Sequence, residues 1–168
     1  MAFIDTSIMK IPFEGFDSYK ENIGIMKGVV GKIFTIFDYR DESISQGTLS
    51  TYLAESVFLP SVLLSDHIEF KEIDDYTVEG KLTYNNLEVR GTFHFNEFYE
   101  MTSFVADKRG NMDSDGNLEY HKWTAECRDY KVNEEGLKLP TNFKAIWNYP
   151  EGDFVYFDGE ITKIEYGN

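Results

Sequence analysis

The side chains that could do chemistry in this 168-residue chain are one cysteine, three histidines and 30 acidic residues. Cys127 lies in a strand-like stretch, where a single thiol most often serves as a small buried hydrophobic group. His67, His94 and His121 are scattered along the sequence without the spacing of metal ligands. We therefore assign no catalytic residue, no metal site and no cofactor to these side chains.

Residues 111–116 form the sharpest short pattern. Asn111, Asp113 and Asp115 alternate and are followed by Gly116, as in the first half of a calcium-binding loop. The match then ends, because the twelfth position, which holds a bidentate glutamate in such loops, is Lys122. An Asp- and Gly-rich turn explains the pattern without a metal, and a weak calcium site is the alternative.

One stretch has helical rather than strand-like spacing. Apolar residues at positions 49, 52, 53 and 57 share one helical face, which predicts a short helical insertion near residues 48–64, interrupted at Pro60. Glu55 lies at the edge of this apolar stripe. It is either an ordinary carboxylate on the helix flank or a polar anchor at a ligand cavity.

Aromatic residues make up 16% of the chain and are spread over several expected strands. In a closed sandwich they would form the core, whereas in a curved sheet around a helix they could line a cavity for an apolar ligand. On the second interpretation the ligand-binding residues are Tyr52, Leu53, Glu55, Phe58, Phe93, Phe95, Trp123, Trp147 and Tyr149.

The elements that must position these residues are mostly strands. Apolar side chains alternate with period two along residues 76–84 and 87–95, and Asn85-Asn86 between them is a good hairpin turn. Further strands are expected at 3–10, 23–37, 99–108, 118–131, 137–149 and 154–166. We predict a mainly β (α+β) single domain, residues 1–168, built as a curved antiparallel sheet or half-barrel meander with the helical insertion.

Charge and hydropathy exclude several classes of protein. The net charge of −14 argues against binding to nucleic acid or to an anionic membrane surface, both of which need cationic side chains. The longest apolar stretch, 57–64, is far shorter than the roughly 20 residues that cross a bilayer. The N-terminus lacks the features of a secretory signal, and we expect a soluble, cytoplasmic protein.

An ordered set of short motifs resembles an uncharacterised bacterial family, a domain of unknown function. The motifs are PFEGFDSY at 12–19, QGTL at 46–49, YLAE at 52–55, LPS at 59–61, EIDD at 72–75, GLKLPT at 136–141 and EGDF at 151–154. The resemblance implies an architecture like the lipoprotein-carrier (Lol carrier-like) half-barrel, which binds acyl chains. Relatives commonly have a longer N-terminal part, so this chain looks shortened, and an exposed sheet edge would favour a homodimer.

Together these observations favour a non-enzymatic module that binds a hydrophobic or lipid-like molecule in the concave face of the sheet. Two alternatives stay open. One is a hydrolase that uses carboxylates on an unknown substrate, although no pair of acidic residues stands out. The other is a structural or interaction protein with a filled core.

Overall fold

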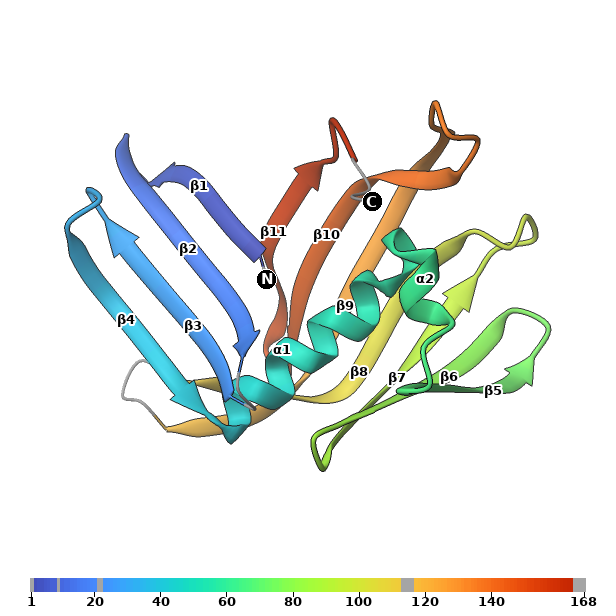
Figure 1. Ribbon diagram of the computed structural model, residues 1–168, viewed down its shortest axis with the longest axis horizontal. Helices are drawn as coiled ribbons and strands as arrows, with labels where there is room; N and C mark the ends of the chain where they lie inside the picture. Colours follow the sequence, from blue (N-terminus) through green and yellow to red (C-terminus); the bar gives the residue numbers. More distant parts are fainter. Residues whose placement is uncertain (1, 9, 21–22, 113–116, 165–168) are drawn as a thin grey trace.

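A computed structural model describes residues 2–8, 10–20, 23–112 and 117–164, which form two antiparallel sheets with a helical segment between them (Figure 1). The first sheet has the order β1-β2-β3-β4. Its strands are β1 (Ala2–Ile8), β2 (Ile11–Lys20), β3 (Ile23–Val30) and β4 (Phe34–Asp41).

The second sheet is a seven-stranded meander in which each strand pairs with its neighbours in sequence. Its strands are β5 (Ile68–Asp74), β6 (Thr77–Tyr84), β7 (Leu87–Phe95), β8 (Met101–Met112), β9 (Leu118–Val132), β10 (Lys138–Tyr149) and β11 (Gly152–Glu160). Asn85 and Asn86 adopt φ angles of 49° and 67° between β6 and β7. Positive φ at both turn residues is what a two-residue hairpin turn requires, which confirms the predicted turn.

The helical segment links the two sheets in the sequence and lies between them in space (Figure 1). It consists of α1 (Glu42–Glu55), a 3₁₀ turn η1 (Ser56–Phe58) and α2 (Pro60–Leu63). The helix begins six residues before the predicted start at Thr48. Gly47 is a poor helix former and suggests a boundary, yet it lies inside α1, where a Cβ atom would come within 3.3 Å of the Gly110 carbonyl oxygen.

The backbones of α1 and the first sheet are in close contact. The backbone N–H of Gly24 in β3 donates a hydrogen bond of 2.7 Å to the buried hydroxyl of Ser45. A Cβ atom on Gly24 would lie 2.5 Å from the Ser45 nitrogen. Only glycine fits where helix and strand approach so closely.

The side-chain amide of Gln46 connects α1 to the second sheet through hydrogen bonds. Gln46 Nε2 donates to the Lys108 carbonyl oxygen at 2.7 Å, and Gln46 Oε1 accepts from the Gly110 N–H at 2.8 Å. These contacts fall next to the irregularity in β8–β9 pairing between Ala106 and Arg109. Gln46 thus supplies a donor and an acceptor to backbone groups of β8.

The main core fills the space between α1 and the second sheet. Its fully buried side chains include Leu53 of α1, Phe104 of β8 and Trp123 of β9. The Phe104 ring packs edge-on against Phe93 at 4.8 Å and against Trp123 at 6.3 Å. Gly91 in β7 leaves room for this ring, because a Cβ atom there would lie 2.1 Å from Phe104 Cζ.

The predicted fold class, mainly β with a helical insertion, is confirmed, but the chain forms two sheets where one was expected. The predicted strand at 23–37 is a hairpin, β3 and β4, which turns at Gly31 and Lys32 with φ angles of 62° and 63°. Along the described part of the chain, no helix combines the length and apolar character needed to cross a membrane.

Candidate functional site

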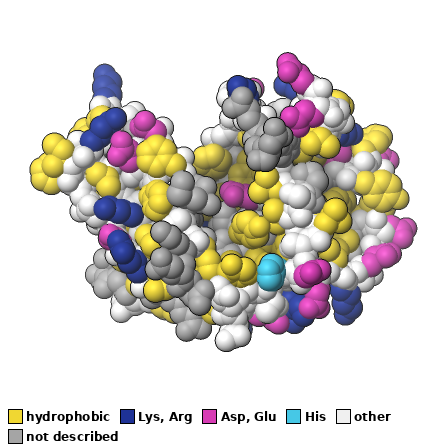
Figure 2. Space-filling view, viewed as in Figure 1, with side chains coloured by type: hydrophobic (Ala, Val, Ile, Leu, Met, Phe, Trp, Pro, Cys, Tyr) yellow, Lys and Arg dark blue, Asp and Glu magenta, His cyan; other side chains and the backbone are white. Residues whose placement is uncertain are grey.

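The candidate site is a cavity of about 410 Å³ beside α1, which we call the helix-face cavity. Its walls come from α1, β2, β6 and the segments that flank α2. The lining residues are Tyr19, Thr48, Leu49, Thr51, Tyr52, Glu55, Leu59, Ser65, His67, Leu82 and Tyr84. Figure 2 shows hydrophobic side chains around a hollow between the first sheet and the helical segment.

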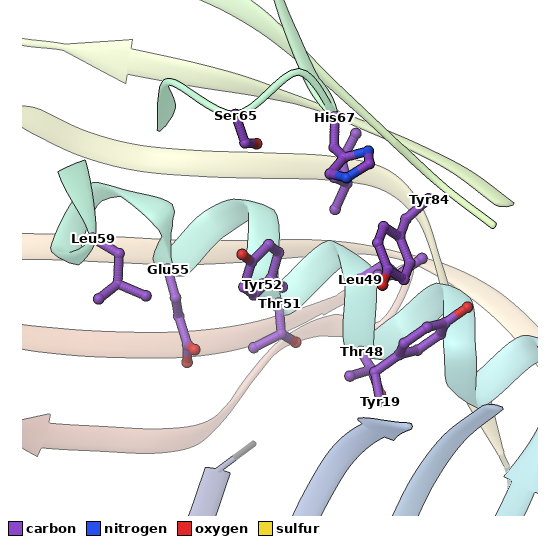
Figure 3. A pocket seen from close by; sticks show the side chains of 11 residues that line it. Tyr19, Thr48, Leu49, Thr51, Tyr52, Glu55, Leu59, Ser65, His67 and Tyr84 are labelled. Carbon is purple, nitrogen blue, oxygen red and sulfur yellow. The ribbon is translucent and has the colours of Figure 1, made fainter. Parts of the chain in front are cut away.

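Helical spacing sets one wall of the helix-face cavity. Thr48, Thr51 and Glu55 are separated by three and four residues, which places them on one face of α1. Figure 3 shows the three side chains following one another along the helix. This wall carries two hydroxyl groups and one carboxylate, and the Thr51 hydroxyl already bonds the Gly47 carbonyl oxygen and Arg109. Leu49, Leu59 and Leu82 line the same cavity.

Three rings form a second wall. Tyr84, the last residue of β6, contacts Tyr19 of β2 edge-on with ring centroids 5.6 Å apart. His67 contacts the same Tyr84 ring edge-on at 5.1 Å. Tyr84 and His67 are exposed, so the cavity opens to solvent at this wall (Figure 3). Residues from both sheets therefore meet here.

The hydroxyl of Tyr19 is an unusual group at this wall. Its oxygen is buried and makes no hydrogen bond to any described residue. Most buried side-chain polar atoms in native proteins have a partner, and an exception calls for an explanation.

The nine residues predicted to bind a ligand fall into three groups. Tyr52 and Glu55 line the helix-face cavity. Leu53, Phe93, Trp123 and Trp147 belong to the buried core, and Phe58, Phe95 and Tyr149 are half-buried and pack against it. The space between α1 and the second sheet is therefore largely filled by side chains, and the helix-face cavity borders this core at Leu49 and Leu82. Ligand contact by the nine residues stays a prediction.

Sequence reasoning missed Tyr19, His67 and Tyr84. Tyr19 ends the PFEGFDSY motif, which was quoted only for its resemblance, and Tyr84 lies on the alternating face of its strand next to the turn. His67 had no neighbour with metal-ligand spacing. No local pattern joins the three, because β2 and β6 belong to different sheets and their tyrosines come into contact only in the folded chain.

Cys127 behaves as a small core residue, as predicted. Its side chain is buried among the core residues, and this burial raises the pKa of the thiol to about 12. A thiol in this state is a poor nucleophile, because the reactive form is the thiolate.

The described residues contain no cluster of three or more histidine, cysteine or acidic side chains that could hold a metal ion. His121 pairs with Glu119 at 2.8 Å and stacks edge-on against Tyr149, which gives it a structural partner. Residues 113–116 of the calcium-like pattern lie outside the described residues.

A family model described as a family of unknown function (DUF6544) matches residues 1–159. The match covers nearly the whole chain, and the chain belongs to this family. No curated protein and no solved structure shows significant similarity to the chain.

Proposed function

We propose that this DUF6544 protein is a non-enzymatic binding module whose ligand, a hydrophobic or lipid-like molecule, occupies the helix-face cavity. The observation that carries the proposal is the cavity itself. Its volume of about 410 Å³ falls within the range of roughly 300–1,000 Å³ typical of small-molecule sites. Leucine and tyrosine side chains give it apolar walls, with a few polar groups that could orient a ligand.

The charged groups in and around the cavity limit which ligand head groups it could accept. Glu55 is the only acidic residue among the described side chains that line the cavity, and no lysine or arginine is among them. An anionic head group would face this carboxylate and the protein's net charge of −14. The lack of a basic residue among the described lining residues and the net charge of −14 favour an amphiphile whose polar end is neutral or cationic.

The same lining weakens the alternative of a carboxylate-using hydrolase. Glycosidase chemistry needs two carboxyl groups held across a cleft, and the helix-face cavity presents only Glu55 among its described residues. The third alternative is an interaction protein with a filled core. It accounts for the packed core between α1 and the second sheet but not for the helix-face cavity.

A pair of matched leucine variants tests the proposal. Leu59 lines the cavity, whereas Leu64, five residues later, is 87% exposed and does not. We expect Leu59→Trp to fill part of the cavity and to weaken binding of the neutral lipophilic dye Nile red by about tenfold, equivalent to about 1.4 kcal/mol. Leu64→Trp should bind the dye as the wild type does, and circular dichroism should show both variants folded.

Native mass spectrometry of the purified protein provides a second test. We expect a bound neutral or cationic amphiphile that is retained by the Leu64→Trp variant and lost from the Leu59→Trp variant. Equal dye affinity of the two variants, or no saturable dye binding to the wild type, would rule the proposal out.

Two further proposals rest on the predicted architecture. We propose that the chain shares the half-barrel architecture of the lipoprotein carriers, as the resemblance of its motifs implies, and that this architecture alone carries no function over to it. We also propose a homodimer through the edge strand β11, where Phe154, Val155 and Phe157 are each more than 40% exposed. Light scattering that finds only monomer at high protein concentration would refute the dimer.

A further inference from the structure

Arg109 in β8 is a buried guanidinium next to the first turns of α1. Only 5% of its surface is exposed. Its Nε donates to the Gly47 carbonyl oxygen at 3.3 Å, and its Nη2 donates to Thr51 Oγ1 at 2.9 Å. Its Cζ atom lies 4.6 Å from the ring centroid of Trp123 and 4.8 Å from that of Trp147. Two neutral acceptors and two aromatic rings therefore surround the charge.

This arginine has no described acidic partner. The ion pairs of the described residues involve Arg40, Arg90 and several lysines, but none involves Arg109. The chain carries 30 acidic against 16 basic residues, so carboxylates are abundant. Buried charges in proteins are normally paired because desolvating an isolated charge is costly.

A second cavity, of about 210 Å³, has Arg109 among its lining residues, and we call it the Arg109 cavity. Asn111 adds a polar group to its wall, and Met26, Phe37, Tyr39 and Trp147 give it apolar and aromatic surfaces. A guanidinium has five N–H donors. Those on Nη1 make no hydrogen bond to a described residue.

We propose that the Arg109 cavity binds a small carboxylate with a short apolar body. The end of a guanidinium matches a carboxylate in shape and charge, and such charge-assisted hydrogen bonds are stronger than neutral ones. The aromatic and methionine side chains would contact the apolar part of the ligand. This cavity shares no lining residue with the helix-face cavity, although Thr51 of that cavity bonds Arg109, and it would take a ligand of opposite charge preference.

The two tryptophans of the chain make binding directly measurable. Both contact Arg109, so tryptophan fluorescence, excited at the red edge where the 11 tyrosines do not absorb, reports on the surroundings of this guanidinium. We would titrate the full chain with sodium butyrate and sodium hexanoate at constant ionic strength. Butyramide is the neutral analogue of butyrate, and inorganic phosphate tests whether the site selects a different anion.

Two substitutions test the role of charge. Arg109→Gln removes the cation, and Asn111→Asp places a fixed carboxylate on the wall of the Arg109 cavity. Asn111 is half-buried and its side-chain amide bonds only Tyr149 among the described residues, at 3.2 Å, so the isosteric change should leave the fold intact. Asn86→Asp, at an exposed turn, adds the same charge away from the cavity and is the matched control.

We expect saturable fluorescence changes with butyrate and hexanoate, and binding at least about tenfold weaker for butyramide. Asn111→Asp should bind butyrate about tenfold more weakly than the wild type does, and Asn86→Asp should bind it as the wild type does. Arg109→Gln, if it folds, should not bind. The proposal is overturned if neither carboxylate saturates the signal, if butyramide binds as well as butyrate, if Asn111→Asp binds butyrate normally, or if phosphate binds more tightly.

Discussion

Replacing Tyr19 by phenylalanine should stabilise the protein. The hydroxyl of Tyr19 is buried and bonds to no described residue, so it has lost water without gaining a partner. A buried unsatisfied polar group costs about 1–3 kcal/mol. The edge-on contact between the Tyr19 and Tyr84 rings survives the change, because it involves the ring and not the hydroxyl. We therefore expect the free energy of unfolding to rise by about 1 kcal/mol or more.

Tyr130 offers the matched control. It is also half-buried, but its hydroxyl donates a 2.9 Å hydrogen bond to the Met101 carbonyl oxygen. Tyr130→Phe should lower the free energy of unfolding by about 1 kcal/mol, the typical net value of one hydrogen bond. Urea titrations would measure both variants, with an unchanged m-value showing that only stability has changed.

The test is whether the two substitutions change the free energy of unfolding in opposite directions. If Tyr19→Phe destabilises the protein as Tyr130→Phe does, the Tyr19 hydroxyl is already bonded within the folded chain and the reasoning fails.

Three other substitutions or reactions have definite expected outcomes. Gly91→Ala should cost about 1–3 kcal/mol of stability, measured by urea unfolding, because its Cβ atom would overlap the buried Phe104 ring; a loss below about 0.5 kcal/mol would contradict this packing. Cys127 should not react with Ellman's reagent in the native protein, since burial raises its pKa to about 12, but should react fully once the chain is unfolded; rapid native reaction would contradict its burial. The hydrogen bond from Lys138 holds the pKa of Glu100 below its usual 4.5, so Glu100 stabilises the protein above pH 4.5 and this contribution disappears as the pH falls through the lowered pKa. The stability difference between wild type and Glu100→Gln should therefore shrink on acidification, and a constant difference would refute the assignment.

Alternation along the sequence predicted much of the second sheet. In β7 the residues Leu87, Val89, Phe93 and Phe95 share a face, and all four are buried or half-buried in the structure. Such a pattern is readable because one face of the strand meets the core and the other meets water. The turn at Gly31 and Lys32 was missed because the residues on either side are apolar, so the hairpin looks like one long strand.

The candidate sites were less accessible to sequence reasoning. Helical spacing placed Tyr52 in the apolar stripe and Glu55 at its edge, and both line the helix-face cavity, although ligand contact stays a prediction. Arg109 gave no signal, since an arginine on a strand is ordinarily solvated. Its burial depends on Gly47 and on two tryptophans from other strands, and these contacts exist only in the folded chain.

The attachment of α1 to β8 has a consequence for how the chain folds. Every strand in both sheets pairs with a neighbour in sequence, so the hairpins can form from local contacts with little loop-closure entropy. The bonds from Gln46 to Lys108 and to Gly110 instead join residues 62 and 64 positions apart. We expect the two sheets to form quickly and the docking of α1 onto β8 to be the slow, late step. Both cavities would then be completed only at the end of folding.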